Sequence, residues 1–305
     1  MTADSDAADR YDVVIVGGGP AGCSAGVFTA RYGLDTVVFD RGNSSLRRCA
    51  HLENYLGFPG GIDVETFYDL AHDHAREAGC DLVDDLVESV TRPDADREED
   101  AEPSGFVVET QDGRTVEAAS VVAAARYDAD YLRPLGDEDA MFESHEHDGE
   151  VHEHFDRTYA DRDGRTPIDG LYVASPVESV STQAITAAGH GALVGRHVVG
   201  DARRDEGYWD DAADRVDWVR RERARDPEWG DRDRWRDYFD DAAPDDLDVS
   251  DAEYERLRER EIDDRLDMYV SDDEIDRREQ RAHDRLLEHI DTDRIRAYLD
   301  RVDGD

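Results

Sequence analysis

The sequence contains no lysine, so all 36 of its basic residues are arginines, and they stand against 78 acidic residues. The formal net charge is −42, and the acidic residues are spread along the whole chain. Such a surface repels nucleic acid and anionic membranes, so neither is expected as a main partner. It is typical of a protein from a very salty cytoplasm, where salt screens the self-repulsion. Disorder is the alternative, because high net charge and low apolar content also mark unfolded chains.

Long apolar runs are also missing, and no stretch is long enough to cross a bilayer. The first residues, MTADSDAADRYD, are acidic and polar, unlike a signal peptide. The three cysteines, Cys23, Cys49 and Cys80, have no spacing that suggests a disulfide framework. We therefore expect a cytoplasmic protein with one large or two small domains.

An ordered series of motifs begins near the N-terminus. Residues 12–16, DVVIV, are typical of a buried parallel strand, and residues 17–22, GGGPAG, match the pattern G-x-G-x-x-G. A helix is expected from about 21 to 32, and a second strand, TVVFD, ends at Asp40. A lone glycine pattern also occurs in ordinary α/β turns. The complete order of strand, glycines, helix, strand and acid predicts a dinucleotide site.

The residue types explain how this site would work. Gly17 permits the tight turn, Gly19 lets the backbone approach a pyrophosphate, and Gly22 lets the helix pack on the strand. The N-terminus of the helix presents unpaired N–H groups to the phosphates. The Asp40 carboxylate accepts hydrogen bonds from the adenosine ribose and repels a 2′-phosphate, which disfavours NADP at this site.

Residues 52–63, LENYLGFPGGID, resemble the thioredoxin reductase family and its flavoprotein relatives, in which a similar ENYPGFP segment lies beside the flavin. The segments that follow resemble the same FAD-binding domain: a helix and strand at 64–85, a β-meander and returning strand at 105–125, and a last strand with its flavin-facing helix at 170–199. The resemblance covers residues 11–126 and 168–199. It implies FAD as the cofactor.

The resemblance also implies a fold and a set of cofactor contacts. We expect a doubly wound, parallel, Rossmann-like α/β domain with a β-meander over residues 1–200, and an acidic α-helical extension over 201–305. Asn54 would approach the flavin, and Gln183 would flank its isoalloxazine ring. The expected cofactor-binding residues are Gly17, Gly19, Pro20, Ala21, Gly22, Asp40, Arg41, Asn54, Gln183 and Ala184.

Three departures from the family set the functional expectations. Residues 127–167 are too short for the inserted NADPH domain and carry no second glycine fingerprint, so we expect a short acidic, His-rich insert in its place. No two cysteines have the C-x-x-C spacing, so the family's dithiol chemistry cannot operate. The ATG motif reads Ala124-Ala125-Arg126, and the GD motif reads Ser175-Pro176, where proline offers neither a side-chain acceptor nor an N–H.

Two further clusters are candidate sites. Cys49 follows Arg47 and Arg48, which would favour its thiolate, and it is the candidate catalytic residue. The alternative is a small packed residue in a loop, which is the commoner role of a free cysteine. Residues 144–154 carry His145, His147, His152 and His154 and could bind a transition metal. Because the segment lacks apolar support, we interpret it as a solvated linker and expect no metal site.

The last third of the chain holds all four tryptophans and is predicted to be helical. Ser250 and Ser271 begin capping-box patterns, and a short last helix is expected around 294–302. The apolar stripes are narrow, so these helices need a surface to pack on. That surface would be the FAD-like domain or a second subunit in a homodimer. A docking surface for an electron-transfer partner is the alternative.

Together these features predict an FAD-dependent oxidoreductase that takes electrons from an external donor, for example a small protein. The alternative is a non-catalytic nucleotide-binding or regulatory protein derived from the same fold. The altered Ser175-Pro176 and Arg126 positions motivate that alternative.

Overall fold

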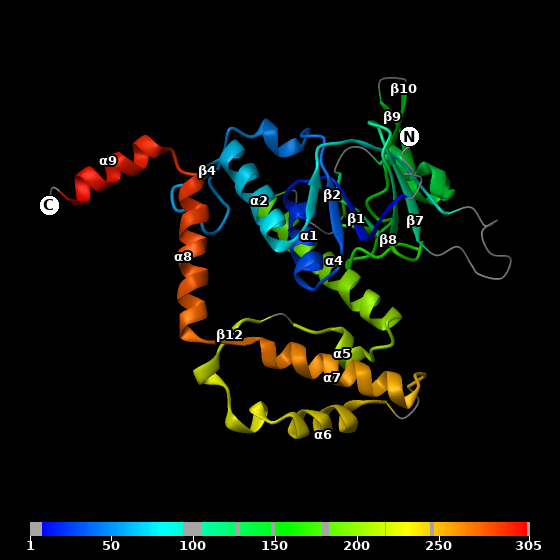
Figure 1. Ribbon diagram of the computed structural model, residues 1–305. Helices are drawn as coiled ribbons and strands as arrows, with labels where there is room; N and C mark the ends of the chain where they lie inside the picture. The colour runs from blue at the N-terminus through cyan, green and yellow to red at the C-terminus, as the bar shows by residue number, and fades with distance from the viewer. Residues whose placement is uncertain are drawn as a thin grey trace, which may run out of the picture. The chain divides into compact units, whose positions relative to one another are not determined.

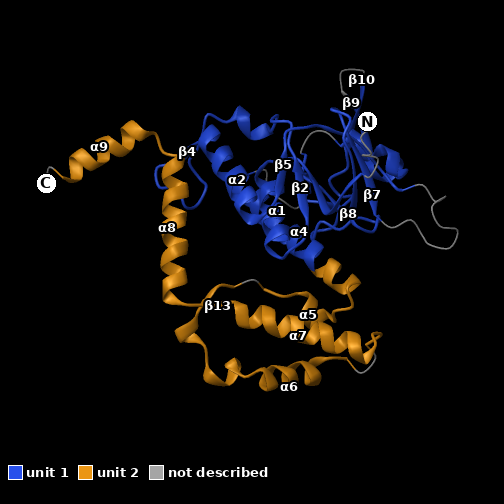
Figure 2. Cartoon of the chain, viewed as in Figure 1, with its two compact units in different colours: residues 1–199 blue, residues 200–305 orange. Residues whose placement is uncertain are grey.

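The structure is a computed structural model that describes residues 8–93, 105–125, 129–147, 150–178, 183–216, 218–244 and 247–303. Arg126 lies outside the described residues. The chain divides into two compact units, residues 1–199 and residues 200–305 (Figure 2).

A mixed sheet, seven-stranded over the described residues, forms the centre of the first unit (Figure 1). Its strands run in the order β5-β2-β1-β8-β7-β6, and β11 also pairs with β8. The strands are β1 (Asp9–Val16), β2 (Thr36–Phe39), β5 (Asp81–Val83), β6 (Val87–Thr91), β7 (Phe106–Thr110), β8 (Thr115–Ala123) and β11 (Leu171–Val173). β5, β2, β1, β8 and β11 pair in parallel, while β6, β7 and β8 form an antiparallel meander. The predicted α/β fold with a parallel-dominated sheet is confirmed.

Apolar residues on both faces of β1 hold it at the centre of this unit. Val13 and Ile15 point to one face, which is covered by α1 (Pro20–Arg31), α2 (Val64–Ala78) and α4 (Ala184–Asp205). Glycines bring α4 close to α1. A Cβ on Gly191 would lie 2.0 Å from the Ala21 carbonyl oxygen, so only glycine permits this approach. The close packing sets the start of α4 beside the start of α1.

The other face of the sheet is covered by the segment between β8 and β11. This segment forms η3 (Asp130–Leu135), α3 (Glu138–Met141), β9 (Phe142–His147) and β10 (Glu150–Phe155). Tyr131, Leu132 and Met141 are buried in the same hydrophobic cluster as Val14 and Val16 of β1. The interpretation of residues 144–154 as a solvated linker is therefore wrong in part. They belong to a β-hairpin whose base packs on the core, although the described histidines remain exposed.

The loop between β2 and α2 begins at the carboxyl end of β2. It contains η1 (Ser45–Arg48) and a small hairpin of β3 (His51–Leu52) and β4 (Ile62–Asp63). Leu52 and Ile62 pack against Phe67 and Tyr68 of α2. The loop that bears the family-like ENY segment is thus anchored on α2.

The second unit is helical, as the sequence predicted. Its elements are α5 (Asp210–Ala213), β12 (Arg220–Arg221), η4 (Glu222–Ala224), η5 (Pro227–Gly230), α6 (Arg232–Ala242), α7 (Asp251–Asp267), β13 (Tyr269–Val270), α8 (Asp272–Glu288) and α9 (Thr292–Val302). Ser250 caps α7 by accepting from the Glu253 amide, and Ser271 caps α8 by accepting from the Glu274 amide. Its small core is built from Tyr208, Trp209, Ala212, Ala213, Trp235, Phe239, Leu257 and Ile262.

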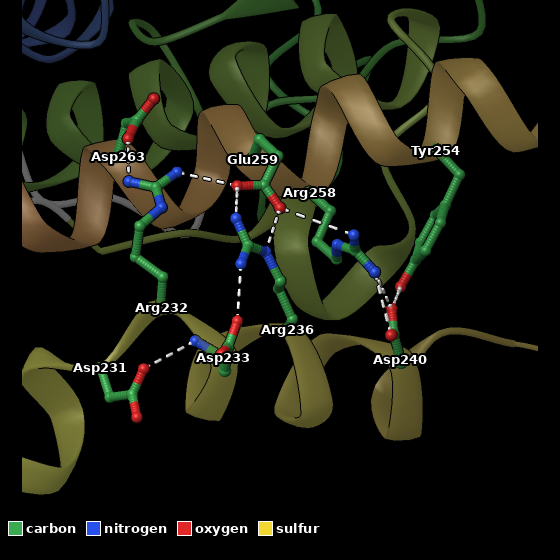
Figure 3. Close-up of polar contacts among 9 residues, drawn as sticks. All are labelled: Asp231, Arg232, Asp233, Arg236, Asp240, Tyr254, Arg258, Glu259 and Asp263. Atoms are coloured by element: carbon green, nitrogen blue, oxygen red, sulfur yellow. Dashed lines mark hydrogen bonds and ion pairs between the residues drawn. The ribbon is translucent and has the colours of Figure 1, made fainter.

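Arginine–carboxylate pairs join α6 to α7 beside this core (Figure 3). The Glu259 carboxylate of α7 accepts from Arg236 Nε at 2.7 Å and from Arg232 Nη2 at 2.8 Å. Arg258 lies 3.5 Å from Glu259 and also pairs with Asp240 of α6. Hydrogen bonds from Arg236 and Arg232 lower the pKa of Glu259 to about 2, against the opposing effect of burial. These pairs add to the cohesion of a unit with few apolar residues.

The last two helices bury little. Within the described residues, α8 and α9 contain no buried residue, and Leu286, Ile290 and Leu299 are each about half exposed. No described helix combines the length and the apolar character that crossing a bilayer requires.

Candidate dinucleotide site

A pocket opens where the parallel strands β1, β2, β8 and β11 end. Ligands of open α/β sheets bind at this carboxyl-terminal edge. The lining residues include Gly17, Gly18, Gly19 and Pro20 after β1, Asp40 and Arg41 after β2, Ala124 and Ala125 after β8, and Ala174, Ser175, Pro176 and Val177 after β11. Ala21, Ala184 and Ala187 line it from the starts of α1 and α4. Four strand ends and two helix starts therefore meet at one cavity.

The three fingerprint glycines have different roles in this geometry. Gly17 has a φ of +110°, and a Cβ there would lie 3.0 Å from the Ala124 carbonyl. A Cβ on Gly22 would lie 1.8 Å from the Gly17 oxygen, so the turn and the helix start exclude any side chain. A Cβ on Gly19 would make only ordinary contacts, 3.5 Å from Ser44 Oγ and 3.8 Å from Tyr68 Oη. Gly17 and Gly22 are therefore required by the fold, while Gly19 presents bare backbone to the pocket.

The start of α1 is suited to an anion. Gly19 is the N-cap and has no side chain to bond the first-turn amides, and Pro20 occupies the first helical position. The amides of Ala21 and Gly22 thus have no side-chain cap. Unsatisfied N–H groups at the positive end of a helix dipole attract phosphate.

The Asp40 carboxylate lines the pocket and is fixed in place by its neighbours. Its Oδ1 accepts from the Gly42 amide at 3.2 Å, and its Oδ2 lies 3.3 Å from His72 Nε2. Burial alone raises the pKa of Asp40, but the hydrogen bonds from His72 and Gly42 outweigh it and hold the pKa below its ordinary value. Asp40 therefore remains an ionised acceptor near neutral pH.

Two residues that support Asp40 were not singled out from the sequence. His72 Nε2 also lies 3.0 Å from the Gly18 carbonyl oxygen, so this histidine joins the glycine loop to the carboxylate. A Cβ on Gly18 would lie 2.6 Å from that of Asp40, so the middle glycine is required as well. No local pattern in the sequence signals the contact of His72 with Asp40, because it depends on how α2 packs against α1.

The two residues expected near the flavin lie together. Asn54 Nδ2 donates to Gln183 Oε1 at 2.8 Å, which joins the loop before α2 to the residue preceding α4. Ala184, the next residue, lines the pocket, whereas Asn54 and Gln183 are not among its lining residues. The aromatic rings of Tyr55 and Phe67, 4.9 Å apart, support this loop.

The loop after β11 carries the altered Ser175-Pro176 motif and is bonded to the end of β8. The amides of Ala174 and Ser175 both donate to the Ala123 carbonyl oxygen, at 2.8 and 3.3 Å. Pro176 follows in the pocket wall without a side-chain acceptor. Tyr131 and Arg157, from the segment between β8 and β11, line the same pocket and were not predicted. The glycine fingerprint does not predict these two residues, because they lie between β8 and β11, far from it in the sequence.

All three cysteines are described, and Cys49 alone is exposed, in the wall of the pocket. Burial raises the pKa of Cys23 and of Cys80 to about 12, so both remain thiols. The Arg47 guanidinium lies 3.9 Å from Glu65 and 4.9 Å from the ring centre of Tyr68. Cys49 is thus the accessible thiol of the chain.

The histidines of the hairpin lie along its exposed strands. His145 and His152 are directly opposite each other in the β9–β10 register, and the rings of His145 and His154 are 6.2 Å apart. His145 Nε2 also lies 3.2 Å from Glu143. In the described part of the chain, which leaves out the His147 side chain, no three His, Cys, Asp or Glu side chains are grouped as metal ligands.

Sequence comparisons find similarity to one family over the N-terminal part of the chain. The profile of the pyridine nucleotide-disulphide oxidoreductase family matches residues 11–125. The curated bifunctional thioredoxin reductase/thioredoxin of Mycobacterium leprae (strain TN) is 31% identical over 134 residues, 43% of this chain and 27% of that protein. The thioredoxin reductase of Aquifex aeolicus (strain VF5) is 36% identical over 75 residues, 24% of this chain and 23% of that protein. The chain spans about a quarter of the length of these relatives.

Among solved structures, a thioredoxin reductase from Gloeobacter violaceus aligns with a TM-score of 0.48 and 16% identity, over 64% of this chain and 95% of that one. An atypical thioredoxin reductase from Desulfovibrio vulgaris Hildenborough aligns with a TM-score of 0.48 and 19% identity, over 63% of this chain and 98% of that one. The sequence comparisons confirm the predicted resemblance to thioredoxin reductases.

Proposed function

We propose that this chain, thioredoxin reductase-like over residues 11–125, is an FAD-dependent oxidoreductase without an NAD(P)H domain or a redox dithiol of its own. Residues 127–167 leave no room for the family's inserted domain, so an external donor, such as a small protein, would reduce the flavin. The main support for this proposal is the pocket at the strand ends. An uncapped helix start, the bare backbone of Gly19 and an ionised Asp40 lie together there.

These groups fit the ADP portion of a dinucleotide. Gly19 would admit the diphosphate to the first-turn amides of α1, and Asp40 would accept from the ribose hydroxyls. The flavin would extend toward Ala184 and the bonded pair of Asn54 and Gln183. FAD bound there would supply reversible electron transfer.

The residues of the chain itself would bind and orient the cofactor. Cys49 would present an exposed thiol in the wall of the same pocket. Cys49 is the candidate catalytic residue because it is exposed in the pocket wall. A single thiolate cannot both attack a disulfide and release itself from the mixed disulfide. Disulfide chemistry at Cys49 would therefore need a second thiol from the substrate.

One observation favours a second function. Pro176 replaces the acidic residue that the family places near the ribityl and pyrophosphate region, so the flavin side of the pocket has lost an acceptor. A non-catalytic nucleotide-binding or regulatory protein needs only the ADP side, which keeps all its groups.

A visible spectrum of the protein purified in molar KCl tests both functions, followed by mass spectrometry of the nucleotide that it releases. Flavin absorbance that disappears on reduction and returns with an acceptor supports the oxidoreductase. Absence of flavin absorbance, with no gain when FAD is added, contradicts it. An ADP-like ligand released without flavin supports the second function. Molar salt is needed because a chain with a net charge of −42 repels itself in dilute buffer.

A further inference from the structure

The segment between β8 and β11 supplies part of the wall of the dinucleotide pocket. Tyr131 and Arg157 line the pocket beside the glycine loop and the Ser175–Val177 turn. In the family that the sequence resembles, a whole domain is inserted at this point of the chain. Here the short segment packs on the sheet and reaches the pocket instead.

The backbone on both sides of Arg157 is fixed. Its carbonyl oxygen accepts from the Glu178 amide at 3.0 Å, which ties it to the turn after β11. On one side, Asp156 Oδ1 accepts from the amide and the hydroxyl of Thr158 at 2.8 and 2.7 Å. On the other side, Tyr159 is buried, and its hydroxyl donates to Asp137 at 2.9 Å. The backbone is therefore held while the side chain is exposed.

The Arg157 guanidinium has no hydrogen bond or ion pair within the ranges that the structure describes. Three described carboxylates, that of the preceding Asp156 and those of Asp40 and Asp85 in the pocket wall, have hydrogen-bond partners of their own. Asp156 bonds Thr158, Asp40 bonds Gly42 and His72, and Asp85 accepts from the Leu86 amide at 2.7 Å. Within the described residues, the pocket wall thus contains a guanidinium that is open to an anion.

We propose that Arg157 binds the phosphate groups of the nucleotide that occupies this pocket. A guanidinium presents paired N–H donors that match two phosphate oxygens. Pro176 brings no carboxylate to this wall and Arg157 brings a positive charge, so this part of the wall is suited to an anion. The inference rests on the proposed dinucleotide site and adds to it a phosphate contact from outside the glycine loop.

The test compares the full chain with R157Q, R157K and the matched control R162Q in molar KCl. Arg162 lies in the same segment, is exposed, and does not line the pocket. Binding of FAD, ADP and adenosine is measured by calorimetry or equilibrium dialysis. We expect R157Q to bind ADP and FAD about tenfold more weakly, R157K to recover part of that loss, and R162Q to match the unchanged chain. Adenosine has no phosphate, so its binding should be the same in all four proteins.

The outcomes separate this inference from the proposed function. Equal binding of ADP and FAD by R157Q and the unchanged chain overturns the role of Arg157 and leaves the flavoprotein intact. Binding of ADP that weakens in R157Q, without any binding of FAD, supports Arg157 and contradicts the flavoprotein. If the unchanged chain binds neither nucleotide, both are wrong. Loss of adenosine binding in R157Q would indicate a damaged fold, which also counts against a phosphate role.

Discussion

Replacing Gly19 by alanine tests whether this glycine is needed for nucleotide binding and not for folding. A methyl group on Gly19 meets only Ser44 Oγ at 3.5 Å and Tyr68 Oη at 3.8 Å, so the loop accommodates it. Its backbone, φ −77° and ψ −174°, is open to any residue. The free energy of unfolding should therefore change by less than about 1 kcal/mol. The same methyl group lies where a diphosphate must approach the backbone.

The effect on binding follows from the contacts that the methyl group blocks. A hydrogen bond from an amide to a charged phosphate contributes about 1.5–3 kcal/mol. Losing one such bond weakens binding of ADP and FAD about 10-fold to 100-fold. G22A is the opposite comparison, because its methyl group would lie 1.8 Å from the Gly17 oxygen. We expect G22A to destabilise the first unit by about 1–3 kcal/mol or more.

The assay pairs nucleotide binding with denaturant unfolding in molar KCl. Far-ultraviolet circular dichroism follows both units, whereas tryptophan fluorescence follows the second unit alone, since all four tryptophans lie there. G19A should unfold like the unchanged protein by both probes and bind nucleotide weakly. A folded G19A that binds ADP and FAD with unchanged affinity would refute the assignment of the glycine loop as a phosphate site.

Three further predictions concern single side chains. E259Q should destabilise the second unit: the pKa shift from 4.5 to about 2 corresponds to about 3 kcal/mol at most, and solvent screening reduces it to about 1 kcal/mol. Because the pKa of Glu259 is lower in the folded state, this stability is present above about pH 4.5 and is lost as the pH falls toward 2. Unfolding followed by tryptophan fluorescence should therefore depend less on pH in E259Q than in the exposed control E255Q. H72L should weaken ADP binding several-fold, because Asp40 loses the hydrogen bond that helps to hold its pKa down. The pH below which ADP binding is lost should therefore be higher in H72L, and measuring ADP affinity against pH checks this. A thiol reagent should modify Cys49 alone in the native protein and all three cysteines after unfolding; rapid native labelling of Cys23 or Cys80 would contradict their burial.

The parts of the fold that the sequence predicted are those governed by local rules. The apolar run of β1 and the glycine turn follow from the geometry of a βαβ unit, and the acid after β2 occurs at the spacing that a ribose contact requires. Ser250 and Ser271 similarly marked helix starts through their side-chain bonds to the third amide.

The parts that escaped prediction depend on contacts distant in sequence. His72 reaches Asp40 only because α2 packs beside α1, and nothing in its own neighbourhood signals that contact. Arg157 reaches the pocket only because its segment folds back on the sheet. The sequence favours a linker at residues 144–154 because the core contact of this hairpin is made by Phe142 and Phe155, which lie outside that range.

The two sides of the pocket now give a quantitative criterion for function. The ADP side has Gly19, the uncapped start of α1 and Asp40, and these groups are independent of the flavin. In the proposed binding mode the flavin side would be Ala184 and the altered Ser175-Pro176 turn, with the Asn54–Gln183 pair outside the pocket lining. If the flavin side contributes, FAD must bind more tightly than ADP, and each tenfold preference corresponds to about 1.4 kcal/mol of contact with the isoalloxazine and ribityl groups. Equal affinities would mean that the flavin side makes no net contribution, and the nucleotide-binding alternative would then replace the oxidoreductase.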